Sequence, residues 1–180
     1  MKKNLSQTIE IPSGVEAKME GNVFKVKGPE GSNEREFNFT KLTVEQKGNE
    51  ITIGNKVATK NEKKRINSIT AHIKNMIAGV QKKYEYKLKV CFSHFPATVE
   101  IKGQEARIKN FLGEKINRVT TIPKGAEVKV DKDIITINSV DIETAGQAAA
   151  NLEMITRIRK RDRRVFQDGI FITSKNGVDI

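Results

Sequence analysis

The sequence lacks the features that mark several large classes of protein. Only one of its 180 residues is cysteine, so no disulfide can form within the chain, and nothing indicates an oxidising compartment. No apolar run approaches the roughly 18 residues that a membrane-spanning helix needs. The basic segment Met1–Gln7 is followed by alternating residues and not by the apolar core of a signal peptide. We therefore expect a soluble, intracellular protein with no membrane partner.

Acidic residues are scarce relative to basic ones. The chain has 33 lysines and arginines against 22 aspartates and glutamates, which gives a formal net charge of +11 and a pI of about 9.7. A field of this sign attracts polyanions, nucleic acid first and acidic membranes or proteins second. The alternative is that the charge only keeps the protein soluble. Net charge thus indicates a class of partner and does not specify a fold.

The hydrophobic pattern of the first half predicts two hairpins and then a helix. Apolar and charged residues alternate on both sides of a Gly-Asn turn in residues 15–27, and they do so again in residues 42–53. The period then changes. Apolar residues from Ile66 to Val80 recur at the spacing that lines one face of a helix of about five turns.

The second half repeats this order. Residues 95–102 match residues 11–18, and residues 135–137 match residues 51–53, in both cases 84 positions apart. Other pairs of hairpins in the chain also resemble one another. Only this offset, however, keeps the order hairpin, strand, hairpin, helix in both halves, so it indicates a duplication.

We therefore predict an α+β protein of two similar domains from an internal duplication, each an antiparallel sheet with one helix packed on a face. The predicted boundaries are residues 1–82 for the N-terminal domain, 83–174 for the C-terminal domain and 175–180 for a tail. Asp141 suits the N-cap of the second helix, whose apolar face is expected to reach Ile158. Neither half alternates strands and helices as a parallel nucleotide-binding sheet does.

The positive charge is most concentrated in Arg157–Arg164, which has five arginines in eight residues and a net charge of +5. A guanidinium group forks onto phosphate and stacks on exposed bases. Cations at the end of a helix also complement its dipole, but that role accounts for one or two of them. We therefore predict that nucleic acid contacts the basic residues of this segment: Arg157, Arg159, Lys160, Arg161, Arg163 and Arg164.

Two further segments are basic. Residues 107–118 have a net charge of +3, and Lys109, Lys115 and Arg118 are expected to lie on the same nucleic-acid-binding face. Residues 60–83 have a net charge of +6. Within them, Lys63, Lys64 and Arg65 form either a second contact with RNA or protein, or a solvated helix face.

No catalytic or metal-binding constellation can be assembled from the sequence. Cys91 and His94 are three residues apart, but a zinc site needs four ligands. Cys91 follows apolar residues, so we expect a buried structural thiol. The turn Gly28–Gly31 lacks the Gly-Lys-Ser/Thr ending of a phosphate-binding loop. We expect no enzyme, no cofactor, no metal and no small-molecule substrate.

Five motifs in fixed order resemble those of a ribosomal protein family, and the resemblance runs from about Ile9 to Phe171. The family is the large-subunit ribosomal protein family L-six, and the stretch Arg161–Gly169 is similar to its archaeal and eukaryotic branch. The motifs are Ile11-Pro12-Ser13-Gly14-Val15, Val26-Lys27-Gly28-Pro29-Glu30-Gly31, Asn75-Met76-Ile77-Ala78-Gly79-Val80, Ser93-His94-Phe95-Pro96 and Gly146-Gln147-Ala148-Ala149-Ala150.

The resemblance implies a structural constituent of the cytoplasmic large ribosomal subunit. It implies binding to 23S rRNA near the base of the stalk and the factor-binding region, chiefly by the C-terminal domain, with neighbouring ribosomal proteins as further partners. It makes His94 and the loop from Asn110 to Lys115 candidate contacts, while Phe95 and Phe111 either stack on RNA or fill the core. The alternative function is a non-ribosomal module that binds anions or docks on proteins.

Overall fold

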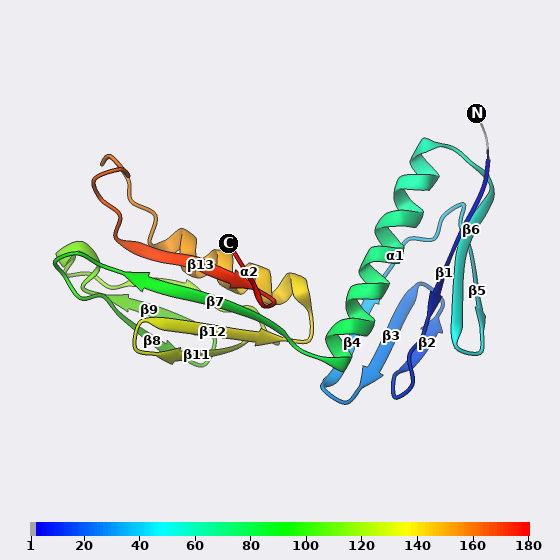
Figure 1. Ribbon diagram of the computed structural model, residues 1–180, viewed down its shortest axis with the longest axis horizontal. Coiled ribbons are helices and arrows are strands. Elements are labelled where there is room, and N and C mark those ends of the chain that lie inside the picture. Colours follow the sequence, from blue (N-terminus) through cyan, green and yellow to red (C-terminus); the bar gives the residue numbers. More distant parts are fainter. Residues whose placement is uncertain (1–2) are drawn as a thin grey trace. The chain divides into compact units, whose positions relative to one another are not determined.

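The computed structural model describes residues 3–180, apart from the side chains of Lys3 and Lys47. The chain divides into two compact units, Met1–Lys83 and Tyr84–Ile180. Each unit consists of antiparallel strands and one long helix (Figure 1). The predicted α+β fold class is therefore confirmed.

The N-terminal unit contains two three-stranded sheets and the helix α1 (Lys60–Gln81), which packs against both sheets. One sheet has the order β1-β6-β5 and consists of β1 (Lys3–Glu10), β5 (Thr43–Lys47) and β6 (Glu50–Ala58). The other has the order β2-β3-β4 and consists of β2 (Glu16–Glu20), β3 (Val23–Gly28) and β4 (Gly31–Glu36). Both predicted hairpins are present, as β2–β3 and β5–β6.

A capping box begins α1. The Thr59 side chain accepts a hydrogen bond from the backbone N–H of Asn61, and Glu62 accepts one from the backbone N–H of Thr59 (2.9 Å). The Thr59 hydroxyl also donates to the Glu62 carboxylate, and this bond, together with that from the backbone N–H of Thr59, holds the pKa of Glu62 below its usual range. The helix has 22 residues, about six turns, where the sequence predicted about five. Its predicted apolar face, from Ile66 to Val80, is buried against the sheets.

The C-terminal unit contains a larger sheet of order β11-β12-β7-β13-β14 and a smaller one of order β10-β9-β8. The larger sheet consists of β7 (Tyr84–Cys91), β11 (Glu127–Asp131), β12 (Ile134–Ser139), β13 (Gly169–Lys175) and β14 (Val178–Asp179). The smaller consists of β8 (Thr98–Lys102), β9 (Glu105–Lys109) and β10 (Arg118–Thr121), with the short 3-10 helix η1 (Phe111–Gly113) before β10.

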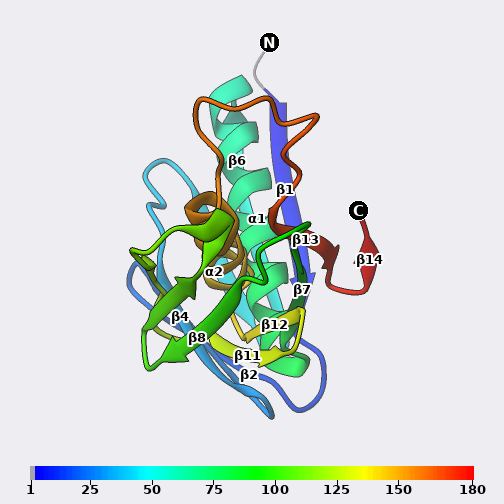
Figure 2. The same ribbon diagram turned by 90° about the vertical axis from the view of Figure 1, so that its left-hand side faces the viewer.

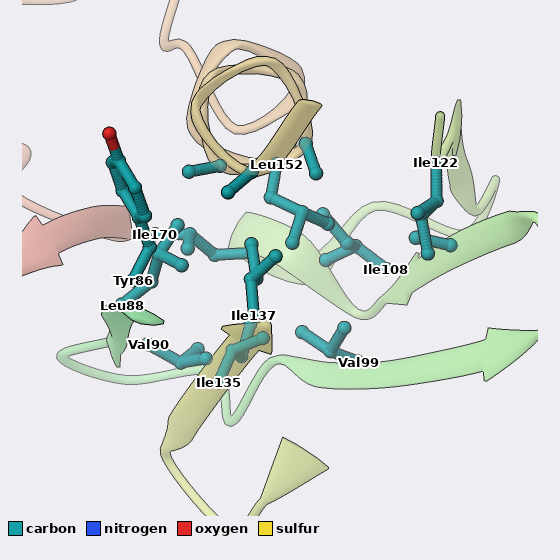
Figure 3. Close-up of a cluster of buried hydrophobic side chains, with 14 of the residues drawn as sticks. Tyr86, Leu88, Val90, Val99, Ile108, Ile122, Ile135, Ile137, Leu152 and Ile170 are labelled. Carbon is teal, nitrogen blue, oxygen red and sulfur yellow. The ribbon is translucent and has the colours of Figure 1, made fainter. Parts of the chain in front are cut away.

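Helix α2 (Ile142–Ile155) packs against the larger sheet and also contacts β10 of the smaller one. Asp141 is its N-cap, as predicted, and accepts hydrogen bonds from the backbone N–H groups of Glu143 and Thr144. Figure 3 shows Leu152 of α2 above Ile137 of β12, with Leu88 of β7 and Ile108 of β9 on either side. The core of this unit therefore joins the helix to strands of both sheets.

The two units repeat the same order of elements, which confirms the predicted duplication. In each unit, a three-stranded meander (β2-β3-β4 or β8-β9-β10) is followed by a hairpin and then by the helix. The first strand of each unit, β1 or β7, pairs with the second strand of that hairpin, β6 or β12. The C-terminal unit alone continues past its helix, through a loop to β13 and β14.

Residues 175–180 were predicted to form a tail, but they take part in the larger sheet. Lys175 is the last residue of β13, and β14 pairs with Ser174 and Lys175. Ile180 donates a backbone hydrogen bond to the carbonyl of Thr173 (3.0 Å). Figure 2 shows this hairpin at the C-terminal end of the chain.

Candidate nucleic-acid interface

The predicted basic segment forms an irregular loop between α2 and β13. We call residues 157–167 the arginine loop; Figure 1 shows it in orange, projecting beyond the ends of both elements. All six of its basic residues are exposed. The sequence placed Ile158 on the second helix, but α2 ends at Ile155. The Thr156 hydroxyl donates to the carbonyl of Glu153 (2.9 Å), and the chain leaves the helix there.

Buried polar groups hold both ends of the arginine loop. At its start, the Thr156 hydroxyl also accepts a hydrogen bond from the backbone N–H of Ile170 (3.0 Å), which ties α2 to β13. At its end, Asp168 is only 7% exposed, and its carboxylate accepts from the backbone N–H (3.1 Å) and hydroxyl (3.0 Å) of Ser93. A loop fixed at both ends loses less conformational entropy on binding than a free one.

Arg118 is a third anchor of the arginine loop. Its guanidinium donates to both carboxylate oxygens of Glu114 (2.8 and 2.6 Å) and to the carbonyls of Ile155 (2.7 Å) and Arg157 (3.4 Å). It also lies 4.4 Å from the ring centroid of Phe111, and its side chain is only 24% exposed. Arg118 therefore stabilises the carbonyl end of α2, where a cation is favoured by the helix dipole.

Asp162 organises the middle of the loop. Its carboxylate accepts from the backbone N–H of Arg164 (2.9 Å) and from the Arg164 guanidinium (3.2 and 2.9 Å). Its carbonyl accepts from the backbone N–H groups of Val165 and Phe166. The hydrogen bonds from Arg164 lower the pKa of Asp162, so the carboxylate is ionised at neutral pH. The only acidic residue of the segment thus sets its backbone turn.

The basic side chains of the loop divide into two groups. Arg164 pairs with Asp162, and the guanidinium of Arg161 lies 4.7 Å from the ring centroid of Phe166. The remaining four side chains make no hydrogen bond or ion pair with any residue that the structure describes. These four are Arg157, Arg159, Lys160 and Arg163.

The other predicted contacts of this unit differ in their surroundings. Lys109 forms an ion pair with Glu100 (2.5 Å), and Asn110 adopts a left-handed conformation (φ 56°) and donates to the carbonyl of Pro96 (3.2 Å). Both therefore have structural partners. Lys115 and His94 are exposed, and among the described residues their side chains have no hydrogen-bond partner. The contact role of all these residues stays a prediction.

The two phenylalanines whose position the sequence left open have different environments. Phe111 is buried and belongs to the core, beneath the Arg118 guanidinium. Phe95 is 48% exposed, and its ring lies beside Gly113. Phe111 is therefore unavailable to stack on RNA, whereas Phe95 presents part of its ring to solvent.

The second predicted basic patch lies in the N-terminal unit, on the first two turns of α1. Lys63, Lys64 and Arg65 are exposed. Arg65 donates to the carbonyl of Thr40 (3.3 Å). The patch has the character of a solvated helix face, and a contact with RNA or protein stays a prediction.

Comparison with known proteins gives the family. A protein-family model described as ribosomal protein L6 matches residues 11–83 and 95–169, one segment in each structural unit. The chain belongs to the ribosomal protein L6 family. Family membership makes it a structural protein of the ribosome, so the prediction that it is not an enzyme is confirmed.

Relatives with the name large ribosomal subunit protein uL6 match nearly the whole chain. The protein of Ignicoccus hospitalis is 42% identical over 172 residues, covering 93% of this chain and 92% of its own length. That of Staphylothermus marinus is 44% identical over 175 residues, covering 94% of each chain. That of Methanospirillum hungatei is 42% identical over 179 residues, covering 96% and 98%. These archaeal relatives agree with the predicted branch of the family.

A further prediction about this L6-family chain is wrong, in addition to those for Ile158 and the tail. Cys91, expected as a buried thiol, is partly exposed. Side chains alternate along β7, and the buried Leu88 and Val90 face α2, so the next residue points to the opposite face of the sheet. Among residues 3–180, no cluster of three or more metal-ligating side chains occurs, and no helix is long and apolar enough to cross a membrane.

Proposed function

We propose that this chain is a structural constituent of the large ribosomal subunit that binds 23S rRNA through its arginine loop and stabilises the folded RNA. The proposed location is near the base of the stalk and the factor-binding region, with neighbouring ribosomal proteins as further partners. Family membership supports assembly into the ribosome, and the motif resemblance supports the location.

The observation that carries the proposal is the state of the arginine loop. Its ends are held by Thr156, Asp168 and Arg118, while four cationic side chains at its surface have no partner among the described residues. Desolvating a cation is costly unless an anion compensates for it. The four cations are therefore suited to phosphate, which compensates their charge. Because the backbone that carries them is already fixed, little conformational entropy is lost on binding.

The proposed mechanism is neutralisation of phosphates on folded RNA. A-form RNA presents its backbone and shallow groove, so contacts of this kind position the protein by shape and read little sequence. The direct contacts would come from Arg157, Arg159, Lys160 and Arg163, with Arg161, Arg164, His94 and Lys115 beside them. Lys109, Asn110 and Arg118 would act by holding neighbouring segments in place.

The salt dependence of RNA binding tests the proposal. If four or five phosphates are engaged, log K should fall with log salt at a slope on the order of −3 to −4. Replacing Arg159, Lys160 and Arg163 by alanine should flatten the slope by about 2 and weaken binding. A charge-matched control replaces the exposed residues Lys102, Lys129 and Lys132. Equal slopes for the two triple variants would contradict the proposal.

A second measurement concerns the predicted patch on α1. Replacing Lys63, Lys64 and Arg65 by alanine leaves the arginine loop intact, because the patch belongs to the other structural unit. If the patch contacts RNA, this variant lowers the slope as well; if it contacts a protein, only retention on large subunits falls. Co-sedimentation with large subunits in moderate salt distinguishes these cases, and no change in either identifies a solvated face.

A further inference from the structure

A groove of about 540 Å³ lies between the end of β7 and the arginine loop. Phe92, Phe166 and Phe171 line it, together with Arg163 and Gln167. Phe92 is 40% exposed and Phe171 is 36% exposed. Large aromatic side chains are thus open to solvent beside the most basic segment of the chain.

These phenylalanines do not serve the core of the unit. On β13, Ile170 is buried toward α2, and Phe171 lies on the opposite face of the sheet, as does Cys91 on the neighbouring strand β7. The core is closed on the helix side by residues such as Leu88 and Leu152. The exposed rings therefore call for an explanation other than packing of this unit.

Local contacts hold the walls of the groove in place. The bonds between Asp168 and Ser93 join the arginine loop to the residue after Phe92. A Cβ on Gly169 would lie only 3.1 Å from the Phe171 ring, so that ring packs directly against the glycine. The guanidinium of Arg161 covers Phe166. The groove is preformed, which lowers the entropic cost of filling it.

We propose that this groove binds one unpaired nucleobase of the RNA; this inference rests on the proposed function and names the kind of nucleotide that the loop recognises. Bases that leave a helix stack on aromatic faces, and proteins recognise RNA largely through such bases. The groove's volume lies in the range typical of sites for small ligands. A base within a continuous duplex cannot enter it, because both of its faces are already stacked.

The polar groups of the groove suit a nucleotide better than an apolar protein segment. Arg163 has no partner among the described residues and lines the groove, where the phosphate of an inserted nucleotide would compensate its charge. The amide nitrogen of Gln167 donates to the carbonyl of Arg164 (3.2 Å), so its Oε1 is left to accept from a base. Every base has a π-face, so the site would tolerate different bases.

The test compares two RNA hairpins of equal length and charge in binding to the full chain. One carries a single bulged 2-aminopurine, and the other has the same nucleotide fully paired. The wild-type chain should bind the bulged hairpin about tenfold more tightly, since stacking of one base contributes on that scale. The fluorescence of the bulged base should also change on binding. Phe92→Leu and Phe171→Leu should remove most of this preference and leave the salt slope unchanged.

Phe39→Leu is the matched control, because Phe39 is partly exposed but lies in the other structural unit and does not line the groove. Leucine keeps most of the apolar volume, and Phe92→Leu alone decides the question if Phe171→Leu fails to fold. Equal binding of both hairpins with a normal salt slope overturns the inference and leaves the proposed function standing. Loss of all salt-dependent RNA binding overturns the proposed function itself. If Phe92→Leu binds RNA normally but dissociates from large subunits, the groove holds a protein side chain and the inference is wrong.

Discussion

Arg118 shows at the scale of one residue that a basic side chain beside the proposed RNA-binding loop can have a structural role. Its guanidinium connects Glu114 to the last carbonyl of α2 and covers Phe111. Lysine cannot reproduce this forked geometry. We expect Arg118→Lys to lower the free energy of unfolding by about 1–2 kcal/mol, discounted for partial exposure, in urea denaturation.

The matched control for that variant is Arg159→Lys, which makes the same change at an exposed side chain without a partner among the described residues. Its unfolding free energy should equal that of the wild type. If both variants lose the same stability, Arg118 has no special anchoring role.

Acid should weaken the same anchor. Hydrogen bonds from Arg118 lower the pKa of Glu114 below its usual 4.5. A carboxylate with a lowered folded-state pKa stabilises the protein above its unfolded pKa, and the contribution is lost as pH falls through the folded pKa. The difference in unfolding free energy between wild type and Glu114→Gln should thus be constant from pH 7 to about pH 5. It should shrink below pH 4.5; a difference that persists unchanged at pH 3 would contradict this origin.

At the scale of elements, the arginine loop depends on the acidic residue within it. Removing Asp162 raises the net charge by one, so simple electrostatics predicts tighter RNA binding. We expect the opposite for Asp162→Ala, a loss of about threefold to tenfold, because the turn at Arg164 loses its acceptor and each lost contact costs about 1 kcal/mol.

Two comparisons isolate this effect in a filter-binding measurement. Asp162→Asn keeps an acceptor for the backbone of Arg164 and should recover part of the affinity. Asp131→Ala removes the same charge from the end of β11, far along the chain, and should leave affinity equal or slightly higher. Tighter binding by Asp162→Ala would show that charge outweighs loop geometry.

The periodicity of the sequence predicted most helices and strands, but not β13 and β14 at the end of the second half. Both N-terminal hairpins and both helices have a clear period of two or 3.6, so their type follows from which side chains must be buried. The strand β13 was missed because Gly169–Lys175 has buried residues next to each other and a bulge between Ile172 and Ser174. Its residues pair with β7 residues that lie 78 to 89 positions earlier, and a local sequence pattern does not show such a long-range contact.

At the scale of the whole molecule, the two units have separate cores. The buried cluster of the C-terminal unit draws only on residues from Tyr84 onward. We therefore expect a fragment of residues 83–180 to unfold cooperatively and to bind RNA with the salt slope of the full chain. Calorimetry and salt-dependent binding check this, and a slope smaller by more than about 1 would show that the N-terminal unit supplies phosphate contacts.

The sequence alone determined the class of this protein, its duplication and the segment in which positive charge is most concentrated. Those properties depend on composition, short-range periodicity and the order of motifs, all of which can be read directly from the order of the residues. Only the tertiary structure decided what each basic residue does. Arg118 and Arg159 have the same side chain, yet one binds Glu114 and a helix end while the other has no partner among the described residues. Likewise Phe111 is buried and Phe92 is exposed. The physical reason is that partners and burial come from residues distant in sequence, which only folding brings together.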